Sequence, residues 1–186
     1  MQLLLSTANP TGIASLLGRA ITVASEEAVD LRALAPLQEH GLQTAEFGNA
    51  DGDTTHAGAV KMYGASTLYV IYYTAGLALC FERSKGDQFE LEALELYSSD
   101  AQYRAVEASL LPIEGLSITT TGKELVQAFG EPDDKGGGMR EGIDIWFRWD
   151  TVGHGAGLEV QMDSRSWEDG QRCAWRSIIY FKSSEQ

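Results

Sequence analysis

The sequence predicts an α+β fold, in which helices pack on one face of an antiparallel sheet. Three observations lead to this prediction. Apolar residues recur at helical spacing in the first 41 residues and again after Thr121. Runs that alternate apolar and polar residues follow both segments. The order of helix and strands therefore occurs twice, and we expect two tandem units, each a helix with three or four strands.

Two helices are expected in the first unit. The run NPTGIASLLGRAI, residues 9–21, opens with Asn9 as a favourable N-cap and carries one apolar stripe. The run SEEAVDLRALAPLQEHG, residues 25–41, has acidic residues in its first turn, although Pro36 should kink or split it. The polar, glycine-containing run at 48–58 then predicts a loop between these helices and the strands.

The strands of the first unit are expected after this loop. The run STLYVIYYTAGLALCFER, residues 66–83, is typical of two strands joined by a turn at 74–76. In the next run, residues 89–99, the apolar residues occupy odd-numbered positions up to Ala93 and even-numbered positions from Leu94 to Leu96. A bulge between Ala93 and Leu94, or a strand that begins near Leu94, explains the change. Acidic residues alternate along this run, so we expect an edge strand.

A short helix is expected to open the second unit, in the run TTTGKELVQAFGEPDDKGGG at residues 119–138. Thr121 and Glu124 have the spacing of a capping box. The glycine after Phe129 is placed to end the helix in the left-handed conformation, and the next proline prevents continuation. The GEPD motif is therefore expected to form a structural turn, comprising Gly130, Glu131, Pro132 and Asp133. The glycines that follow predict a flexible turn.

The same run lacks the elements of a phosphate-binding loop. That motif needs G-x-x-x-x-G-K followed by Ser or Thr. Here six residues separate Gly115 from Gly122, and Glu124 rather than a hydroxyl residue follows Lys123. We therefore expect no bound nucleotide at this helix.

Three alternating strands are expected to complete the second unit, in the runs at 142–150, 155–163 and 175–184. One side of the first strand is apolar and should face the core, through Ile143, Ile145, Phe147 and Trp149. Both halves share the order of apolar strand, turn and AGL, which predicts an internal repeat. The predicted units are residues 1–112, with an inserted helical segment, and residues 113–186, packed as one compact domain.

The second unit resembles known protein families at these points. The capped helix that ends in FGEPD, the glycine-rich turn, the alternating aromatic strand and the final strand resemble the β-lactamase-inhibitor-protein fold. They also resemble the small outer-membrane assembly lipoproteins, and the two-unit arrangement is similar to the phagosome-assembly-factor family. The match covers residues 115–181. It implies a protein without catalytic activity that binds partners through the open face of a curved sheet.

Four residues are the candidate binding residues of this face. Trp146 and Arg148 alternate with the core-facing residues of their strand, and Tyr69 and Tyr73 occupy comparable positions in the first unit. Aromatic residues and arginine are common anchors of protein interfaces. A second layer, such as the inserted helical segment, could instead cover this side. The alternatives at these residues are thus a protein-binding patch and a covered sheet face.

The charge composition of the chain excludes some classes of binding partner. The chain has 27 Asp and Glu against 14 Lys and Arg, and its formal net charge is -13. Clustered basic residues bind nucleic acid and anionic membranes, so neither partner is expected. The acidic charge fits a basic partner or simply good solubility. No apolar run is long enough to span a membrane. The two cysteines, Cys80 and Cys173, favour a reducing compartment, so a cytoplasmic location is expected, with secretion as the alternative.

No catalytic residue, metal ligand or cofactor is expected. Cys173 and His154 lack any local motif of a nucleophilic site. Residues 49–53 resemble the start of a calcium loop, but Thr54 and Val60 replace the glycine and the glutamate that such a loop requires. The expected function is a non-catalytic protein-interaction module. A small enzyme or ligand carrier with a pocket between sheet and helices is the alternative, and the strands could also form a homodimer.

Overall fold

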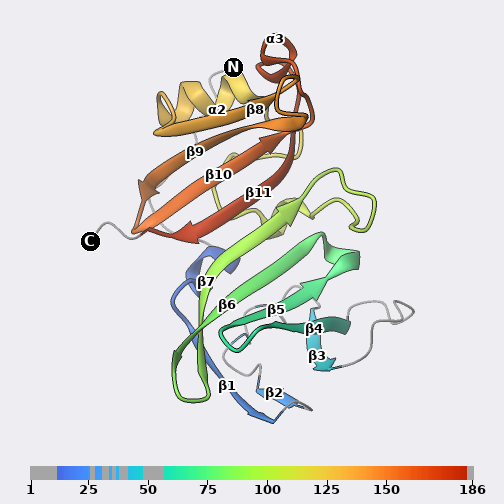
Figure 1. The fold of residues 1–186 in the computed structure, drawn as a ribbon, viewed down its shortest axis with the longest axis vertical. Coiled ribbons are helices and arrows are strands. Elements are labelled where there is room, and N and C mark those ends of the chain that lie inside the picture. Colours follow the sequence, from blue (N-terminus) through green and yellow to red (C-terminus); the bar gives the residue numbers. More distant parts are fainter. Residues whose placement is uncertain are drawn as a thin grey trace.

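The computed structural model shows one continuous, mostly antiparallel sheet (Figure 1). The described residues are 12–25, 28–30, 34, 37, 42–47 and 57–183. Their strands are β1 (Ala20–Ser25), β2 (Ala28–Asp30), β3 (Gln43–Phe47), β4 (Ala57–Tyr63), β5 (Thr67–Tyr72), β6 (Leu77–Lys85), β7 (Gln88–Tyr97), β8 (Asp134–Gly138), β9 (Ile143–Gly153), β10 (Ala156–Met162) and β11 (Trp175–Lys182).

The predicted α+β class is wrong, because antiparallel strands dominate the described residues. The α-helices with described bounds are α2 (Gly122–Phe129) and the single turn α3 (Trp167–Gly170), and Leu37 is also α-helical. Short 3-10 segments also occur, namely η1 (Gly12–Leu16), η3 (Tyr73–Ala75) and η4 (Ala108–Leu110). The expected pair of helix-plus-strand units is not found, because β1 and β2 follow η1 at residues 20–30 and one mostly antiparallel sheet runs through both halves.

A 3-10 turn and a strand replace the first expected helix. Ile13 and Leu16 are fully buried, as the apolar stripe predicts, but η1 lasts only five residues. Gly18 then adopts a φ of 76°, and the β-branched residues that begin at Ile21 enter β1, which pairs with β7. Within the second expected helix, 25–41, residues 28–30 form β2, Leu34 lies in a 3-10 turn and Leu37 is α-helical, whereas most of the other residues lie outside the described ones. Apolar spacing over one turn therefore did not distinguish an α-helix from this arrangement.

Three further strands, β3, β4 and β8, were missed by sequence reasoning. β4 begins within the run assigned to a loop, whose residues 48–56 lie outside the described part of the chain. β8 replaces the expected flexible turn after the GEPD motif and pairs with β9. A Cβ at Gly137 would meet the backbone oxygen of Asp144 at 2.2 Å. These glycines thus permit close packing of strands rather than flexibility.

The sheet consists of two meanders that join along β7 and β11. β4 to β7 form one antiparallel meander, β8 to β11 form the other, and Glu95 lies opposite Ile179 at the junction. β1 pairs with the first residues of β7, and β3 pairs in parallel with β4. β7 is therefore an inner strand, and its prediction as an edge strand is wrong. The internal repeat and its unit boundary at residue 112 stay a prediction.

The bulge expected in β7 lies close to its predicted place. Leu91 pairs with Phe81 and Ala93 pairs with Cys80, so Glu92 is the extra residue. Odd-numbered residues face the core before the bulge, and even-numbered residues face it after the bulge. Because of this reversal, the buried residues on both sides of it face the same core.

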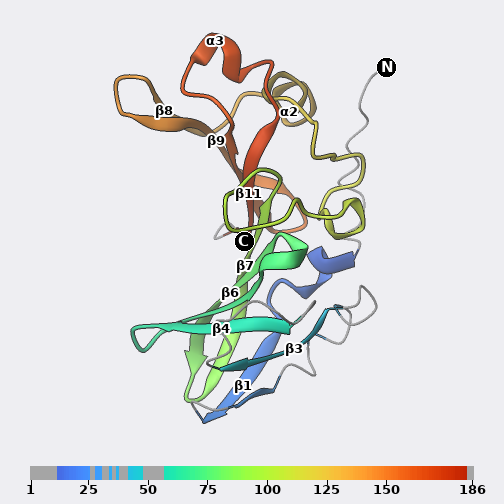
Figure 2. The same cartoon turned by 90° about the vertical axis from the view of Figure 1, so that its right-hand side faces the viewer.

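The hydrophobic core lies on one face of the sheet. The alternation predicted for the strands is confirmed by the fully or almost fully buried residues Leu68, Val70, Leu77, Leu79, Phe81, Ile145, Phe147, Trp149, Leu158, Val160 and Met162. Ile143, at the start of β9, is an exception with 48% exposure. Figure 2 shows α2 and η1 on the same side of the sheet. Leu125 of α2 is fully buried, and the Phe129 ring lies 5.6 Å from that of Trp149.

The predicted capping box of α2 is confirmed. The backbone N–H of Glu124 donates to the Thr121 hydroxyl at 3.4 Å, and the backbone N–H of Thr121 donates to the Glu124 carboxylate at 2.8 Å. The predicted left-handed C-cap is not found, since Gly130 has φ 84° and ψ -170°. This conformation also has a positive φ and is essentially restricted to glycine. The glycine is thus needed here, for a different backbone conformation from the one expected.

Candidate functional site

The candidate site is the face of the sheet opposite the core, called the open face here. Residues paired across neighbouring strands lie on the same face. One such row runs across the sheet through Ala78, Glu95, Ile179, Glu159 and Arg148. By the same register and the alternation along each strand, the open face also carries Tyr69, Cys80, Glu82, Trp146, Asp150 and Phe181.

The four predicted binding residues do not form one patch. Trp146 and Arg148 lie together on β9, whereas Tyr69 lies on β5, five strands away. With neighbouring strands about 4.8 Å apart, that separation is about 24 Å. Tyr73 follows β5 in η3, and its hydroxyl accepts a hydrogen bond from Lys61 at 2.9 Å. The structure thus presents two clusters, one in each meander.

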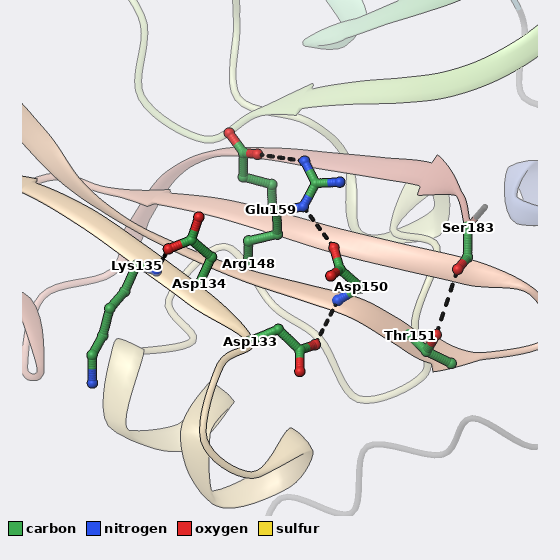
Figure 3. Close-up of polar contacts among 8 residues, drawn as sticks. All are labelled: Asp133, Asp134, Lys135, Arg148, Asp150, Thr151, Glu159 and Ser183. Atoms are coloured by element: carbon green, nitrogen blue, oxygen red, sulfur yellow. Dashed lines mark hydrogen bonds and ion pairs between the residues drawn. The ribbon is translucent and has the colours of Figure 1, made fainter. Parts of the chain in front are cut away.

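The first cluster centres on Arg148 (Figure 3). Its Nε lies 2.8 Å from Oδ1 of Asp150, and its Nη1 lies 3.5 Å from Oε2 of Glu159. The guanidinium also lies 4.5 Å from the centroid of the Phe181 ring, close enough for a cation–π contact. The hydrogen bond that Arg148 donates to Asp150, together with the nearby carboxylates, raises the pKa of Arg148. These contacts hold the guanidinium in place with its side chain 41% exposed.

The GEPD turn is hydrogen-bonded to β9 beside this cluster. The backbone oxygen of Gly130 accepts a hydrogen bond from Nε1 of Trp149 at 3.1 Å. The carboxylate of Asp133 accepts one from the backbone N–H of Asp150 at 2.8 Å (Figure 3). The two bonds reach Trp149 and Asp150, one and two residues after Arg148. The turn therefore fixes the end of α2 to the part of β9 that displays the arginine.

Two glycines leave the space that aromatic rings of the open face occupy. A Cβ at Gly136 would lie 2.6 Å from the indole of Trp146, on the adjacent strand. A Cβ at Gly157 would lie 2.3 Å from the ring of Phe181, again on an adjacent strand. Both distances are too short for a real side chain, so each ring lies directly over a glycine. Phe181 was not singled out in the sequence, where its pairing with a glycine has no visible signal.

The second cluster is built from tyrosines around Glu95. The hydroxyls of Tyr69 and Tyr97 donate to Oε1 and Oε2 of Glu95, at 3.1 Å and 2.8 Å. Tyr97 stacks on Tyr103 with ring centroids 3.9 Å apart, and Tyr103 lies 5.1 Å from Tyr73. Glu95, Tyr97 and Tyr103 were missed because the fold, and not sequence spacing, brings them to the two predicted tyrosines.

The environment of these tyrosines disfavours ionisation. Burial raises the pKa of Tyr69 and of Tyr97, and the adjacent Glu95 charge raises both further. Burial also raises the pKa of Tyr103 to about 12. The hydroxyls thus remain protonated donors at neutral pH, and the cluster has the negative charge of its carboxylate.

One corner of the open face is covered. Ile71 and Ala78 face this side but are 5% and 1% exposed. The chain after β7 passes here, since the backbone N–H of Arg104 donates to the oxygen of Tyr73 and that of Val106 donates to the oxygen of Tyr97. The alternative of a second layer therefore applies to this corner. The half-exposed residues Trp146, Arg148, Glu159, Ile179 and Phe181 lie away from it.

The structure does not bring together a nucleophilic pair. His154 lies in the turn before β10, whereas Cys173 lies beyond the other end of that strand, where its thiol donates to the oxygen of Gly170 at 3.6 Å. The length of a seven-residue strand places them about 20 Å apart. Burial raises the pKa of the thiols of Cys80 and Cys173. No group of three or more potential metal ligands occurs among the described residues, and the run 49–53 lies outside them.

A groove lies on the core side, between α2 and the β8 end of the sheet. Its volume is about 390 Å³. Its lining is mixed, with apolar Val126, Pro132, Phe147 and Trp167 beside Lys123 and Lys135. This is the place that the alternative of a ligand carrier requires. Glu131 lies in the same groove, 3.8 Å from Lys135.

No family model, curated protein or solved structure matches this chain. Among the described residues, no helix combines the length and the apolar character needed to cross a membrane.

Proposed function

We propose that this protein is a non-catalytic interaction module that recognises a protein partner through the open face of its sheet. The observation that carries the proposal is the common placement of Tyr69, Trp146 and Arg148 on this face, opposite the core. Half-exposed aromatic rings and an arginine on a preformed surface are what interfaces use as anchors. The rings over glycines and the clamped guanidinium lose little freedom on binding, which favours affinity.

The charge of the face favours a basic partner. Glu82, Glu95, Asp150 and Glu159 project from it, and its cations include Lys61, opposite Tyr69, and Arg148. Arg148 is already paired with two of these carboxylates. With a net charge of -13 over the whole chain, a positively charged protein would be attracted before contact. We place this function in the cytoplasm, on the free cysteines Cys80 and Cys173.

Quantitative capture of interacting proteins tests the proposal. The double variant Trp146→Ala/Arg148→Ala removes the anchors of the β9 cluster. A matched control, Met139→Ala/Arg140→Ala, also removes one large apolar residue and one arginine, both exposed and outside the open face. We expect a partner that wild type and control retain and the first variant loses, with both variants folded by circular dichroism. Equal recovery by all three proteins would contradict the proposal.

The groove beside α2 favours the second candidate, a small-ligand carrier. A volume of about 390 Å³ lies in the range of small-molecule sites. Val126→Trp would fill the groove without touching the open face. A carrier should lose a co-purifying small molecule, detected by native mass spectrometry, in this variant. An interaction module should keep its protein partner in the same variant.

A further inference from the structure

We propose that Glu95 and the tyrosines around it bind an arginine side chain of a basic partner. The inference rests on the proposed function and specifies the chemistry of one of its two clusters. The guanidinium would pair with the partly exposed carboxylate of Glu95, at the border of the covered corner, and lie beside the partly exposed Tyr69 and Tyr97 rings. The sequence did not indicate this site, because Glu95, Tyr97 and Tyr103 come together only in the fold.

The carboxylate of Glu95 has capacity for a further donor. Two ionised oxygens accept about four hydrogen bonds, and one tyrosine hydroxyl occupies each oxygen. No lysine or arginine among the described residues forms an ion pair with Glu95. The two hydroxyls fix its orientation, so a guanidinium would meet a positioned acceptor. A partly buried carboxylate without a counter-ion is a place where an incoming cation gains more than it would in water.

The rings supply the second part of the site. Tyr97 and Tyr103 stack with an angle of 13° between their planes, and Tyr73 continues the array. The faces of tyrosine rings attract cations electrostatically. Lys61 already uses this property, since its ammonium lies 5.7 Å from the Tyr73 centroid. Its hydrogen bond goes to the hydroxyl of Tyr73, so it leaves the carboxylate of Glu95 to another cation.

The other meander shows the same chemistry completed within the chain. There Arg148 lies over the ring of Phe181 and pairs with Asp150 and Glu159. Around Glu95 the rings and the carboxylate are present without an arginine of this chain among the described residues. Arginine fits better than lysine, because its planar guanidinium stacks on rings and bonds carboxylates with two donors at once.

Titration calorimetry with an oligo-arginine peptide and an oligo-lysine peptide of equal length tests the inference. We expect the wild-type protein to bind the arginine peptide more tightly. Glu95→Gln should weaken that binding about tenfold or more, as expected for a charge-assisted hydrogen bond. Glu131→Gln, which removes one charge from the exposed turn, should change it less than threefold. Equal affinity for both peptides, or equal losses in both variants, would overturn the inference.

The ring protons of the wild-type protein give a second readout that does not depend on a variant. On addition of the arginine peptide, the NMR signals of the Tyr69 and Tyr97 rings should shift more than those of Tyr180, which is buried on the core side. Unshifted rings would overturn the inference. Failure here remains distinguishable from failure of the proposed function. If Trp146→Ala/Arg148→Ala loses the captured partner while Glu95→Gln leaves peptide binding unchanged, the open face is an interface but Glu95 does not bind arginine.

Discussion

The indole of Trp146 lies across Gly136 of the neighbouring strand, so close that a Cβ at residue 136 would stand 2.6 Å from its ring. Trp146 is half-buried as a result, although it points away from the core. The glycine thus converts a surface tryptophan into a fixed, flat element of the open face. The same arrangement recurs between Gly157 and Phe181.

Gly136→Ala should therefore destabilise the protein by displacing the indole. We expect a loss of about 1–3 kcal/mol in the free energy of unfolding, as for other overpacking substitutions. Urea denaturation measures it. In the background of Trp146→Leu the same substitution should cost clearly less, because the obstructing ring is gone. Equal costs in the two backgrounds would show that the indole is not the cause.

Gly130→Ala should destabilise for a different reason. No atom lies within 4 Å of the position of its Cβ, so the cost comes from φ 84° and ψ -170° alone. Such a conformation costs a non-glycine residue about 1–3 kcal/mol. The neighbouring Glu131→Ala, at an exposed residue, serves as the control and should stay within about 0.5 kcal/mol of wild type. An unchanged melting temperature for Gly130→Ala would contradict this account of the turn.

The capping box makes part of the stability dependent on pH. Hydrogen bonds from Thr121 hold the pKa of Glu124 below its usual value of about 4.3. A lowered pKa in the folded state gives stability that is present above the usual value and is lost as the pH falls through the folded pKa. Glu124→Gln should therefore be less stable than wild type at neutral pH, and the difference should shrink below about pH 4. Urea midpoints across this range measure it, and a constant difference would contradict the role of the charge.

Glu95 should be visible in the titration of the tyrosines. Its charge adds to burial in raising the pKa of Tyr69 and Tyr97 above the usual value of about 10. A raised tyrosine pKa gives stability that is complete below about pH 10 and is lost as the pH rises towards the folded pKa. Glu95→Gln should lower both pKa values, so tyrosinate absorbance should appear at lower pH. An unaltered ultraviolet titration curve would place Glu95 outside the tyrosine cluster.

Sequence reasoning succeeded where a local pattern was sufficient. The capping box at Thr121 and the alternating strands after residue 142 depend on neighbouring residues, and the structure contains them. It failed where pairing decides the conformation. The apolar spacing at 9–21 matched a helix, yet its last two residues, Ala20 and Ile21, pair with β7. The glycines before residue 139 form a strand because β9 lies beside them.

The candidate site was predictable only in part. Alternation along β9 was enough to place Trp146 and Arg148 opposite the core-facing residues. The partners of these residues, Phe181 and Glu159, come from other strands, whose register no local pattern determines. The tyrosine cluster likewise needs β5, β7 and the segment after it to meet. Sequence therefore identified some anchors, and the fold alone supplied their surroundings.

Site-specific photo-crosslinking in cells tests the use of the open face most directly. A photoreactive phenylalanine analogue at Gln161, opposite Trp146 on β10, would report what lies over the face. The same analogue at Met139, which is 80% exposed and outside the face, is the control. We predict a discrete adduct with a basic protein from position 161 and none from position 139. No adduct from position 161, or the same adducts from both positions, would contradict the proposal that this face binds a partner.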